Sequence, residues 1–224
     1  MGFLQNFVVF EGADGSGTTT QLNMLADFAH PARKSSGSLQ AAEPEAPYLA
    51  PALHKTFEPT NGPIGRLIRS SLRKETNLAS STIAMLFAAD RNEHLYGPEG
   101  VVERCRRGEL VVSDRYVLSS LVYQGITCGN ELPARLNKDF PGPELLIFFD
   151  IDPETAQKRI SGRSQKEIYE ELDFQIQVCR RYKALLPTLA EQGTRVETID
   201  ASLPAMEVAA KVCALIQKLP IFNK

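Results

Sequence analysis

The sequence predicts an α/β protein in which helices cover both faces of a parallel sheet. Short apolar segments of strand length alternate along the chain with stretches of helical periodicity. In addition, a glycine-rich turn follows the first apolar segment and directly precedes an amphipathic helix. The 224 residues, 43% of them hydrophobic and 23% charged, favour one domain over residues 1–224.

Four segments are apolar and short enough to be buried strands of such a sheet. They are Phe7 to Phe10, Leu110 to Val112, Leu145 to Phe149 and Val196 to Ile199. The segment 31–55 is rich in Ala, Pro and Ser and poor in β-branched residues. We expect it to be an irregular insertion or a weak edge strand.

Apolar residues three or four positions apart predict two helices in the first half of the chain. These positions are Leu22, Leu25, Ala26 and Ala29 in the first helix, and Ala79, Ile83, Leu86 and Asp90 in the second. The Asp90 position is polar, so this helix face must end at something other than the core.

Helix-start signals mark the second half of the chain. Asp152, with a proline after it, is typical of an N-cap. Ser164 and Glu167 match a capping box and predict a helix that runs to about Glu191. Only a short connection, near residues 160–167, separates these two helices. One more helix is expected close to the C-terminus.

The bulk properties exclude several classes of protein. A formal net charge of −2 and a pI near 6.0 give no overall attraction to long nucleic acid. The four cysteines lie far apart without a C-x-x-C pair, so we expect neither a zinc site nor a disulfide framework. No basic leader or membrane-spanning run is evident. We therefore expect a cytoplasmic protein without a membrane partner.

The stretch "FVVFEGADGSGTTTQ" is close to the phosphate-binding pattern G-x-x-x-x-G-K-[ST]. Its glycines allow backbone N–H groups to approach phosphate oxygens, and the following helix directs its positive end toward them. The predicted nucleotide-binding residues are Gly12, Ala13, Asp14, Gly15, Ser16, Gly17, Thr18, Thr19 and Thr20. Thr18 stands where the pattern has lysine, and Thr19 occupies the position that contacts Mg²⁺. The alternative is a turn that only connects strand and helix.

Six collinear stretches resemble the thymidylate kinase family, whose members transfer the terminal phosphate of ATP to dTMP. They are "FEGADGSGTTTQ", "EPTNGPIGRLIR", "LFAADRNEH", "VVSDRYVLSSLVYQG", "LIFFDIDPETAQKRI" and "IDAS". The resemblance covers most of the chain outside residues 31–55. It implies a three-layer P-loop NTPase fold, with a parallel five-stranded sheet between helices and a short lid near residues 160–167. It also implies ATP and Mg²⁺ as co-substrate and cofactor, dTMP as substrate, and a homodimer.

The resemblance also implies roles for residues that would contact the nucleoside. Asp14 would accept a hydrogen bond from the sugar hydroxyl of dTMP; alternatively, it only stabilises its turn. Phe87 and Arg91 share one helix face, where Phe87 would stack on thymine and Arg91 would donate to a base oxygen. The alternative for Phe87 is plain core packing. Asp90 could hold Arg91 in place.

Asp114 and Arg115 follow a buried strand, at the edge of the sheet where ligand sites form in open α/β folds. In the family, the arginine clamps the dTMP phosphate and the aspartate positions Mg²⁺; a surface ion pair is the alternative. Ser119, Tyr123 and Gln124 recur downstream at helical spacing and would bind substrate. Tyr123 either selects deoxyribose by crowding the 2′ position or packs in the core.

Three departures from the family remove positive charge around the phosphates: Thr18, Phe57 in "TFEPT", and "KEIYE" without its usual "DR". Phosphoryl transfer depends on neutralising such charge. Arg163, near the lid, could supply the missing cation or simply face solvent. Together with Asp114 and Arg115, it completes the predicted catalytic set.

The sequence therefore predicts a dTMP kinase that forms dTDP with an atypical P-loop. Because the lysine is missing, a weak or catalytically silent nucleotide-binding protein remains an alternative. A kinase for another pyrimidine monophosphate, such as dUMP, is a third possibility.

Overall fold

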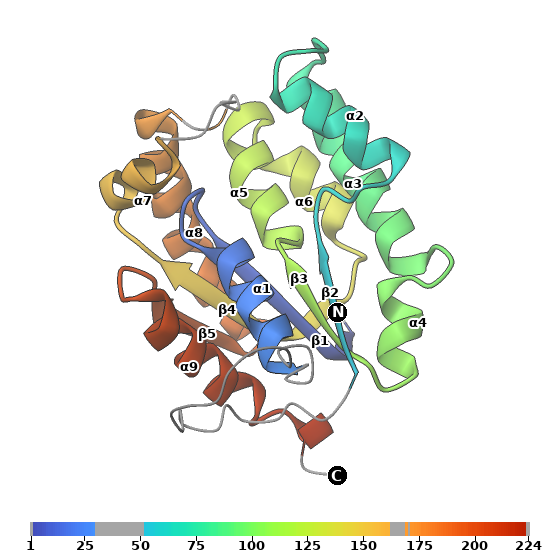
Figure 1. Ribbon diagram of the computed structural model, residues 1–224. Helices are drawn as coiled ribbons and strands as arrows, with labels where there is room; N and C mark the ends of the chain where they lie inside the picture. The colour runs from blue at the N-terminus through green and yellow to red at the C-terminus, as the bar shows by residue number, and fades with distance from the viewer. Residues whose placement is uncertain (1, 30–51, 162–168, 170, 223–224) are drawn as a thin grey trace, which may run out of the picture.

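The computed structural model describes residues 2–29, 52–161, 169 and 171–222. Its five strands form one sheet in the order β2-β3-β1-β4-β5 (Figure 1). The strands are β1 (Phe3–Gly12), β2 (Leu53–Phe57), β3 (Leu110–Asp114), β4 (Gly142–Asp150) and β5 (Val196–Asp200). All neighbouring strands are parallel, so their carboxyl ends meet at one edge of the sheet.

Helices surround this sheet in the described part of the chain (Figure 1). They are α1 (Thr18–Ala29), α2 (Pro63–Leu72), α3 (Ser80–Tyr96), α4 (Val101–Arg106), α5 (Val117–Cys128), α6 (Glu131–Asn137), α7 (Pro153–Ile160), α8 (Leu172–Glu191) and α9 (Ala205–Ile216), with a short 3₁₀ helix at Pro220–Phe222. The predicted helices after the first strand, before the middle strand and near the C-terminus are all present.

Side chains alternate between the two faces of the central strand β1, as strand geometry requires. Val8 and Phe10 belong to the core cluster that includes residues of α1 and α9. Phe7 and Val9 pack on the opposite face with residues of α3 and α4. Leu146 and Phe148 of β4 continue that second face toward α5 and α8. The predicted parallel sheet with helices on both faces is thereby confirmed.

The four strands predicted from apolar segments are present, and the fifth strand is β2 at the edge of the sheet. Its first residues, 53–55, lie in the segment 31–55, for which we expected either an irregular insertion or a weak edge strand. For these three residues the structure confirms the edge strand. None of the β2 residues is buried, which explains why no apolar run marked the strand. Residues 30–51 lie outside the described part.

The start of α8 corrects one prediction. The helix begins at Leu172, after Glu171 in an extended conformation, and not shortly after Ser164. Two residues of its first turn contact Tyr169: the side chain of Gln175 donates to the backbone carbonyl of Tyr169 at 2.7 Å, and the ring of Phe174 stacks on the Tyr169 ring at 5.0 Å. Ser164 itself lies outside the described residues.

The N-cap prediction at Asp152 is confirmed, because its carboxylate accepts hydrogen bonds from the backbone amide and the hydroxyl of Thr155 at 2.9 and 3.1 Å. Pro187 lies inside α8 without ending it. Of the lid expected near residues 160–167, the structure describes residues 160 and 161.

Candidate active site

The glycine-rich turn joins the carboxyl end of β1 to the start of α1. Gly15 and Gly17 have φ angles of +87° and +94°, which favour glycine because other residues would be strained there. A Cβ atom on Gly15 would also lie 2.4 Å from the carbonyl oxygen of Ala156. Since α1 begins at Thr18, its free amides and positive dipole end lie at this turn. The geometry is that of an anion site.

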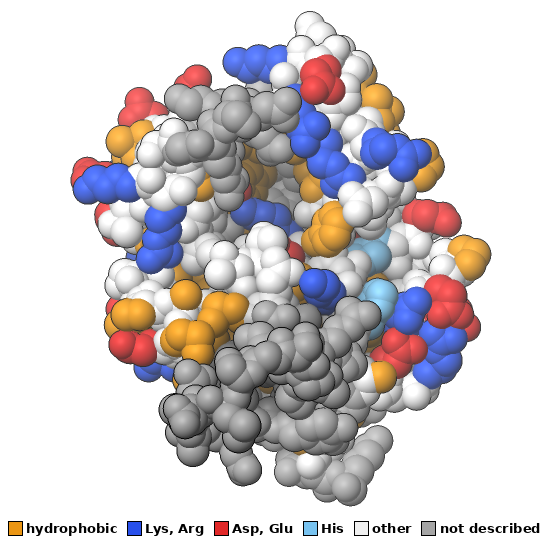
Figure 2. Space-filling view, in the orientation of Figure 1, with side chains coloured by type: hydrophobic (Ala, Val, Ile, Leu, Met, Phe, Trp, Pro, Cys, Tyr) orange, Lys and Arg blue, Asp and Glu red, His pale blue; other side chains and the backbone are white. Residues whose placement is uncertain are grey.

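A cavity of about 670 Å³ lies against this turn. It is lined by residues 14–21 of the turn and α1, by Arg115, Arg159 and Ile160, and by residues 201–205 and 208 after β5. Figure 2 shows this face of the molecule hollowed near its centre, with basic side chains around the hollow. The volume suits a nucleotide, because small-molecule sites are typically about 300–1,000 Å³.

Positive charge is sparse on the described part of this cavity's lining. Thr18 is only 5% exposed and brings no charge. Among the lining residues that the structure describes, Arg115 and Arg159 are the two cations. The Arg159 guanidinium donates to the carbonyl of Ala201 at 3.0 Å, which ties it to the loop after β5. Phe57, at the end of β2 in register with Asp114, is 40% exposed and is likewise uncharged.

Thr19 and Asp114 lie together beside the phosphate-binding turn. The Thr19 hydroxyl donates to Oδ2 of Asp114. The other carboxylate oxygen, Oδ1, is buried and has no hydrogen-bond partner among the described residues. An orphaned carboxylate oxygen next to a hydroxyl is a donor set that suits Mg²⁺, which usually binds one or two protein carboxylates together with water and phosphate oxygens. Consistent with that minimal set, the described residues contain no cluster of three or more His, Cys, Asp or Glu that could hold a metal.

A second cavity, of about 100 Å³, lies between the strand ends and α3 and α5. It is lined by Asp14, Glu58, Pro59, Leu72, Phe87, Arg91, Arg115, Tyr116, Ser119, Ser120, Tyr123, Gln124 and Tyr169. All the predicted substrate-binding residues are among them. Two residues, Asp14 and Arg115, line both cavities. The two spaces therefore meet beside the phosphate-binding turn.

Arg115 has an unusual backbone conformation at the junction of the two cavities. Its φ angle is +74°, in the left-handed region. Its amide donates to the carbonyl of Phe10 at 2.8 Å, and its own carbonyl accepts from the Ser113 hydroxyl at 2.8 Å. These two bonds hold a conformation that costs of order 1–3 kcal/mol, and strain of that kind clusters at functional sites.

The Arg115 guanidinium forms a 2.5 Å ion pair with Asp14 and donates to the Gly12 carbonyl at 3.0 Å. The side chains of Arg115 and Asp14 are 21% and 22% exposed, so the pair is partly buried. The surface ion pair that we considered joined Arg115 to Asp114, which instead accepts from the Thr19 hydroxyl. The second Asp14 oxygen accepts from Nε2 of Gln175 at 2.8 Å. Asp14 is thus fixed from two sides.

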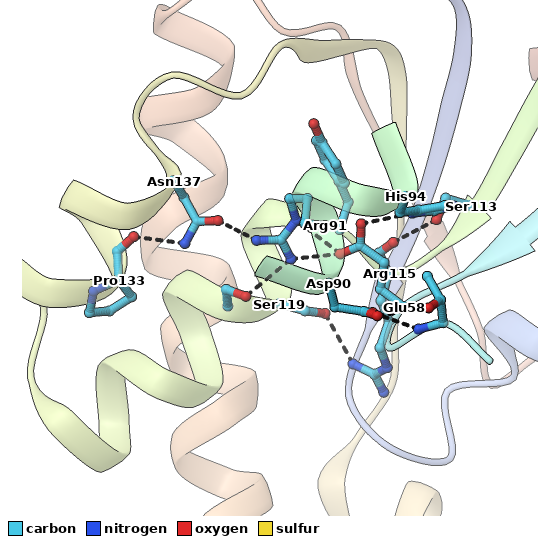
Figure 3. Close-up of polar contacts among 12 residues, drawn as sticks. Glu58, Asp90, Arg91, His94, Ser113, Arg115, Ser119, Pro133 and Asn137 are labelled. Atoms are coloured by element: carbon cyan, nitrogen blue, oxygen red, sulfur yellow. Dashed lines mark hydrogen bonds and ion pairs between the residues drawn. The ribbon is translucent and has the colours of Figure 1, made fainter. Parts of the chain in front are cut away.

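Arg91 is almost completely buried, at 1% exposure, on the floor of the smaller cavity. Figure 3 shows it between Asn137 on one side and Glu58 on the other. Its Nε and one terminal nitrogen donate to the same oxygen of Glu58 at 2.9 and 2.7 Å, and the other terminal nitrogen donates to Asn137. The rings of Tyr116 and Phe140 lie 5.1 and 5.7 Å from the guanidinium.

Asp90 does not hold Arg91, contrary to our expectation. Its two oxygens accept from the amide and the hydroxyl of Thr60, each at 2.7 Å. The carboxylate that pairs with Arg91 is Glu58, 33 positions away in the sequence. Side chains on a helix face one another when they are three or four positions apart. Asp90 and Arg91 are adjacent in the sequence, so their side chains point to different partners.

Phe87, Tyr123 and Gln124 face the smaller cavity from α3 and α5. The Tyr123 ring lies under the Arg115 guanidinium at 5.2 Å, and its hydroxyl accepts from Arg115 at 3.3 Å. Gln124 is 1% exposed, and its side-chain carbonyl has no hydrogen-bond partner in the described chain. Arg163, the remaining predicted site residue, lies outside the described residues.

Several residues of the site had not been predicted. Gln175 and Tyr182 reach it from α8, 51 and 58 positions after Gln124, and no local pattern marks them. Glu11 carried a signal that we passed over, since it is a charged residue inside an apolar strand immediately before the glycine-rich turn. Ser120 lies beside Arg91 at 3.1 Å and belongs to the same helix turn as Ser119.

The phosphate-binding turn, the strand-end carboxylate and two adjoining cavities define a P-loop enzyme of the nucleoside monophosphate kinase class, a phosphotransferase. A family model described as "Thymidylate kinase" matches residues 10–212. The chain belongs to the thymidylate kinase family.

Similar proteins support this assignment. A protein of Treponema pallidum (strain Nichols) named as a thymidylate kinase is 41% identical over 186 residues, which are 83% of this chain and 81% of the relative. One from Pyrobaculum aerophilum is 38% identical over 218 residues, 97% of this chain and 99% of the relative. One from Aeropyrum pernix is 37% identical over 195 residues, 86% and 84% of the two chains. Separately, no helix in the described ranges is long and apolar enough to cross a membrane.

Proposed function

We propose that this protein transfers the γ-phosphoryl group of ATP to dTMP and forms dTDP. The observation that carries the proposal is that the two cavities meet at Asp14 and Arg115, next to the amides of the phosphate-binding turn. A phosphoryl group bound at the turn would be near a monophosphate bound at Arg115. Positioning of this kind, with charge stabilisation, accounts for most of the catalysis in phosphoryl transfer.

ATP fits the larger cavity, with its triphosphate on the turn and the start of α1 and its base toward residues 201–205. Thr19 and Asp114 are the residues that would hold Mg²⁺. When bound, the metal neutralises charge on the phosphate oxygens. No covalent enzyme intermediate is needed, because the acceptor oxygen belongs to dTMP.

The side chains that line the smaller cavity suit the pyrimidine and sugar of dTMP. Phe87 offers a flat apolar face, and Arg91 offers donors that Glu58 holds in a fixed plane. Tyr123 and Asp14 would lie toward the sugar, and Arg115 would bind the monophosphate with Ser119 beside it. A buried carboxamide such as Gln124 is able to read the edge of a base.

The missing lysine favours a second candidate, a weak or silent nucleotide-binding protein. Removing one well-placed electrostatic donor costs on the order of 2.7–4 kcal/mol in the transition state, or roughly a hundredfold to a thousandfold in rate. We infer that Arg163, close to the lid, supplies a cation to the β- and γ-phosphates. The presence of all the predicted substrate-binding residues around the smaller cavity supports the enzyme, because a protein that only binds ATP has no use for a pyrimidine site.

A coupled assay of ADP release with ATP and dTMP tests the proposal. The matched control is the double variant Thr19→Ala/Asp114→Ala, which removes the two residues assigned to Mg²⁺. Turnover well above this control supports the kinase, and turnover equal to it supports the silent binder. Replacing dTMP by dUMP, dCMP or AMP in the same assay identifies the acceptor, and preference for any of these would contradict the assignment to dTMP.

We also propose that α2 and α3 form a homodimer face. These helices pack against each other (Figure 1) and leave Leu67 and Met85 exposed at 40% and 52%. Sedimentation equilibrium should give about twice the mass of the 24.7 kDa chain. A monomer at all concentrations would contradict this, and charged substitution at both positions should dissociate a dimer.

A further inference from the structure

Glu11 is a fully buried carboxylate that the proposed transfer does not use. It occupies the position before the last residue of β1 and is 0% exposed. Burying a carboxylate is unfavourable unless hydrogen bonds satisfy it. Four donors do so here, and all of them belong to α5, its N-cap residue or α8. Their arrangement gives Glu11 two separate tasks, one for each oxygen.

The first oxygen, Oε1, caps α5. It accepts from the backbone amides of Tyr116 and Ser119 at 2.9 and 3.2 Å. Tyr116 is the N-cap residue of this helix, and its own side chain makes no cap bond. Glu11 therefore does from a neighbouring strand what a Ser or Asp N-cap does locally, and its charge also favours the positive end of the helix. The anchored helix carries four residues of the smaller cavity: Ser119, Ser120, Tyr123 and Gln124.

The second oxygen, Oε2, accepts from the hydroxyls of Ser119 and Tyr182 at 2.6 and 2.9 Å. Burial raises the pKa of Tyr182 well above its usual value, so this hydroxyl keeps its proton and remains a donor. The two hydroxyl oxygens lie 2.9 Å apart. Burial raises the pKa of Glu11 to about 7, so at pH 8 its carboxylate is charged and is the stronger acceptor for both hydrogens.

Once both hydrogens point at Glu11, the hydroxyl lone pairs are free to face Arg115. One terminal nitrogen of Arg115 lies 3.2 Å from the Ser119 hydroxyl and 3.5 Å from the Tyr182 hydroxyl. Figure 3 shows Ser119 next to the Arg115 guanidinium. The Glu11 carboxylate thus orients the hydroxyls of Ser119 and Tyr182 as acceptors for Arg115. Glu11 itself lines neither of the two cavities.

We propose that Glu11 is a positioning residue for the phosphate of the acceptor nucleotide, acting through α5 and through the hydroxyls of Ser119 and Tyr182 on Arg115. This inference rests on the proposed function, since it takes Arg115 to bind the monophosphate of dTMP. It assigns Glu11 no contact with substrate. Its effect should therefore appear in dTMP binding and not in ATP binding.

Glu11→Gln tests the proposal with little change of shape. The amide oxygen can still accept from the two backbone amides, but the –NH₂ group then faces the two hydroxyls as a donor. Ser119 and Tyr182 must turn their hydrogens away, and Arg115 loses its acceptors. At pH 8 we expect the KM for dTMP to rise about tenfold, as for the loss of a hydrogen bond to a charged group, and the KM for ATP to stay within about twofold.

Tyr182→Phe provides a second, milder variant in case Glu11→Gln does not fold. It keeps the packed ring and removes one acceptor, so the KM for dTMP should rise about threefold. Glu144→Gln is the matched control: this β4 carboxylate also accepts a backbone amide, from Asn6 at 2.6 Å, but lies away from both cavities. It should leave both KM values unchanged.

Calorimetric titration of each protein with dTMP gives the same comparison without turnover. A folded Glu11→Gln or Tyr182→Phe protein with wild-type affinity for dTMP, or with equal losses for dTMP and ATP, would overturn the positioning role. Wild-type protein that neither binds nor phosphorylates dTMP would instead overturn the proposed function, and with it the substrate that Arg115 is positioned to hold.

Discussion

Glu58→Gln should destabilise the protein strongly, because it leaves the Arg91 guanidinium buried without an opposite charge. The side chains of Arg91 and Glu58 are 1% and 3% exposed and their nearest atoms are 2.7 Å apart. Removing one member of such a pair costs about 3–5 kcal/mol. Glutamine keeps an acceptor for Arg91, so we expect the lower end, about 3 kcal/mol. For a chain of this length that corresponds to a melting temperature lower by about 6–12 °C.

Urea unfolding followed by circular dichroism measures this change in the free energy of unfolding. The double variant Glu58→Gln/Arg91→Met should recover part of the loss, because it also removes the unpaired charge. A loss below about 1 kcal/mol in the single variant, or a double variant as unstable as the sum of the two single ones, would refute the reasoning. The KM for dTMP should rise in both variants, since Arg91 lines the smaller cavity, where we propose that dTMP binds.

Three further predictions concern charge. Burial raises the pKa of Glu11 to about 7 from 4.5, against the opposing effect of Arg115. The folded protein therefore holds this proton more tightly than the unfolded chain does. Its free energy of unfolding should fall by about 3 kcal/mol as the pH rises from 4.5 through 7. Urea unfolding at several pH values measures this fall, and the Glu11→Gln variant should not show it. Thr18→Lys should raise kcat in the coupled assay if the site only lacks charge; a lower kcat would mean that the turn has adapted to threonine. Arg163→Ala should lower kcat by about tenfold or more, and unchanged turnover would remove Arg163 as the compensating cation.

Local patterns were sufficient for the features that depend on neighbouring residues. The phosphate-binding turn follows from glycines at positions where φ is positive, and the Asp152 cap follows from a side chain that bonds three positions ahead. Phe87 and Arg91 were placed together because four residues make about one helical turn, and both line the same cavity.

Features that depend on packing between distant segments were not predictable in this way. Gln175 and Asp14 are 161 positions apart, and Glu58 and Arg91 are 33 apart, so no spacing in the sequence pairs them. The sequence did not decide between a strand and a loop for β2. This strand pairs on one side only and none of its residues is fully buried, so it needs no apolar run. The start of α8 was misplaced because the backbone is extended at Glu171 and the helix begins only after it, a change of conformation that no local pattern marked.

The central claim is that this P-loop, without its lysine, still delivers a phosphoryl group to a pyrimidine monophosphate. Incubation with ATP labelled at the γ-phosphate and with unlabelled dTMP tests it most directly. We predict that the label appears in dTDP, that this transfer requires Mg²⁺, and that it is lost in the Thr19→Ala/Asp114→Ala variant. Label that remains in ATP, or that is released only as inorganic phosphate, would contradict the account.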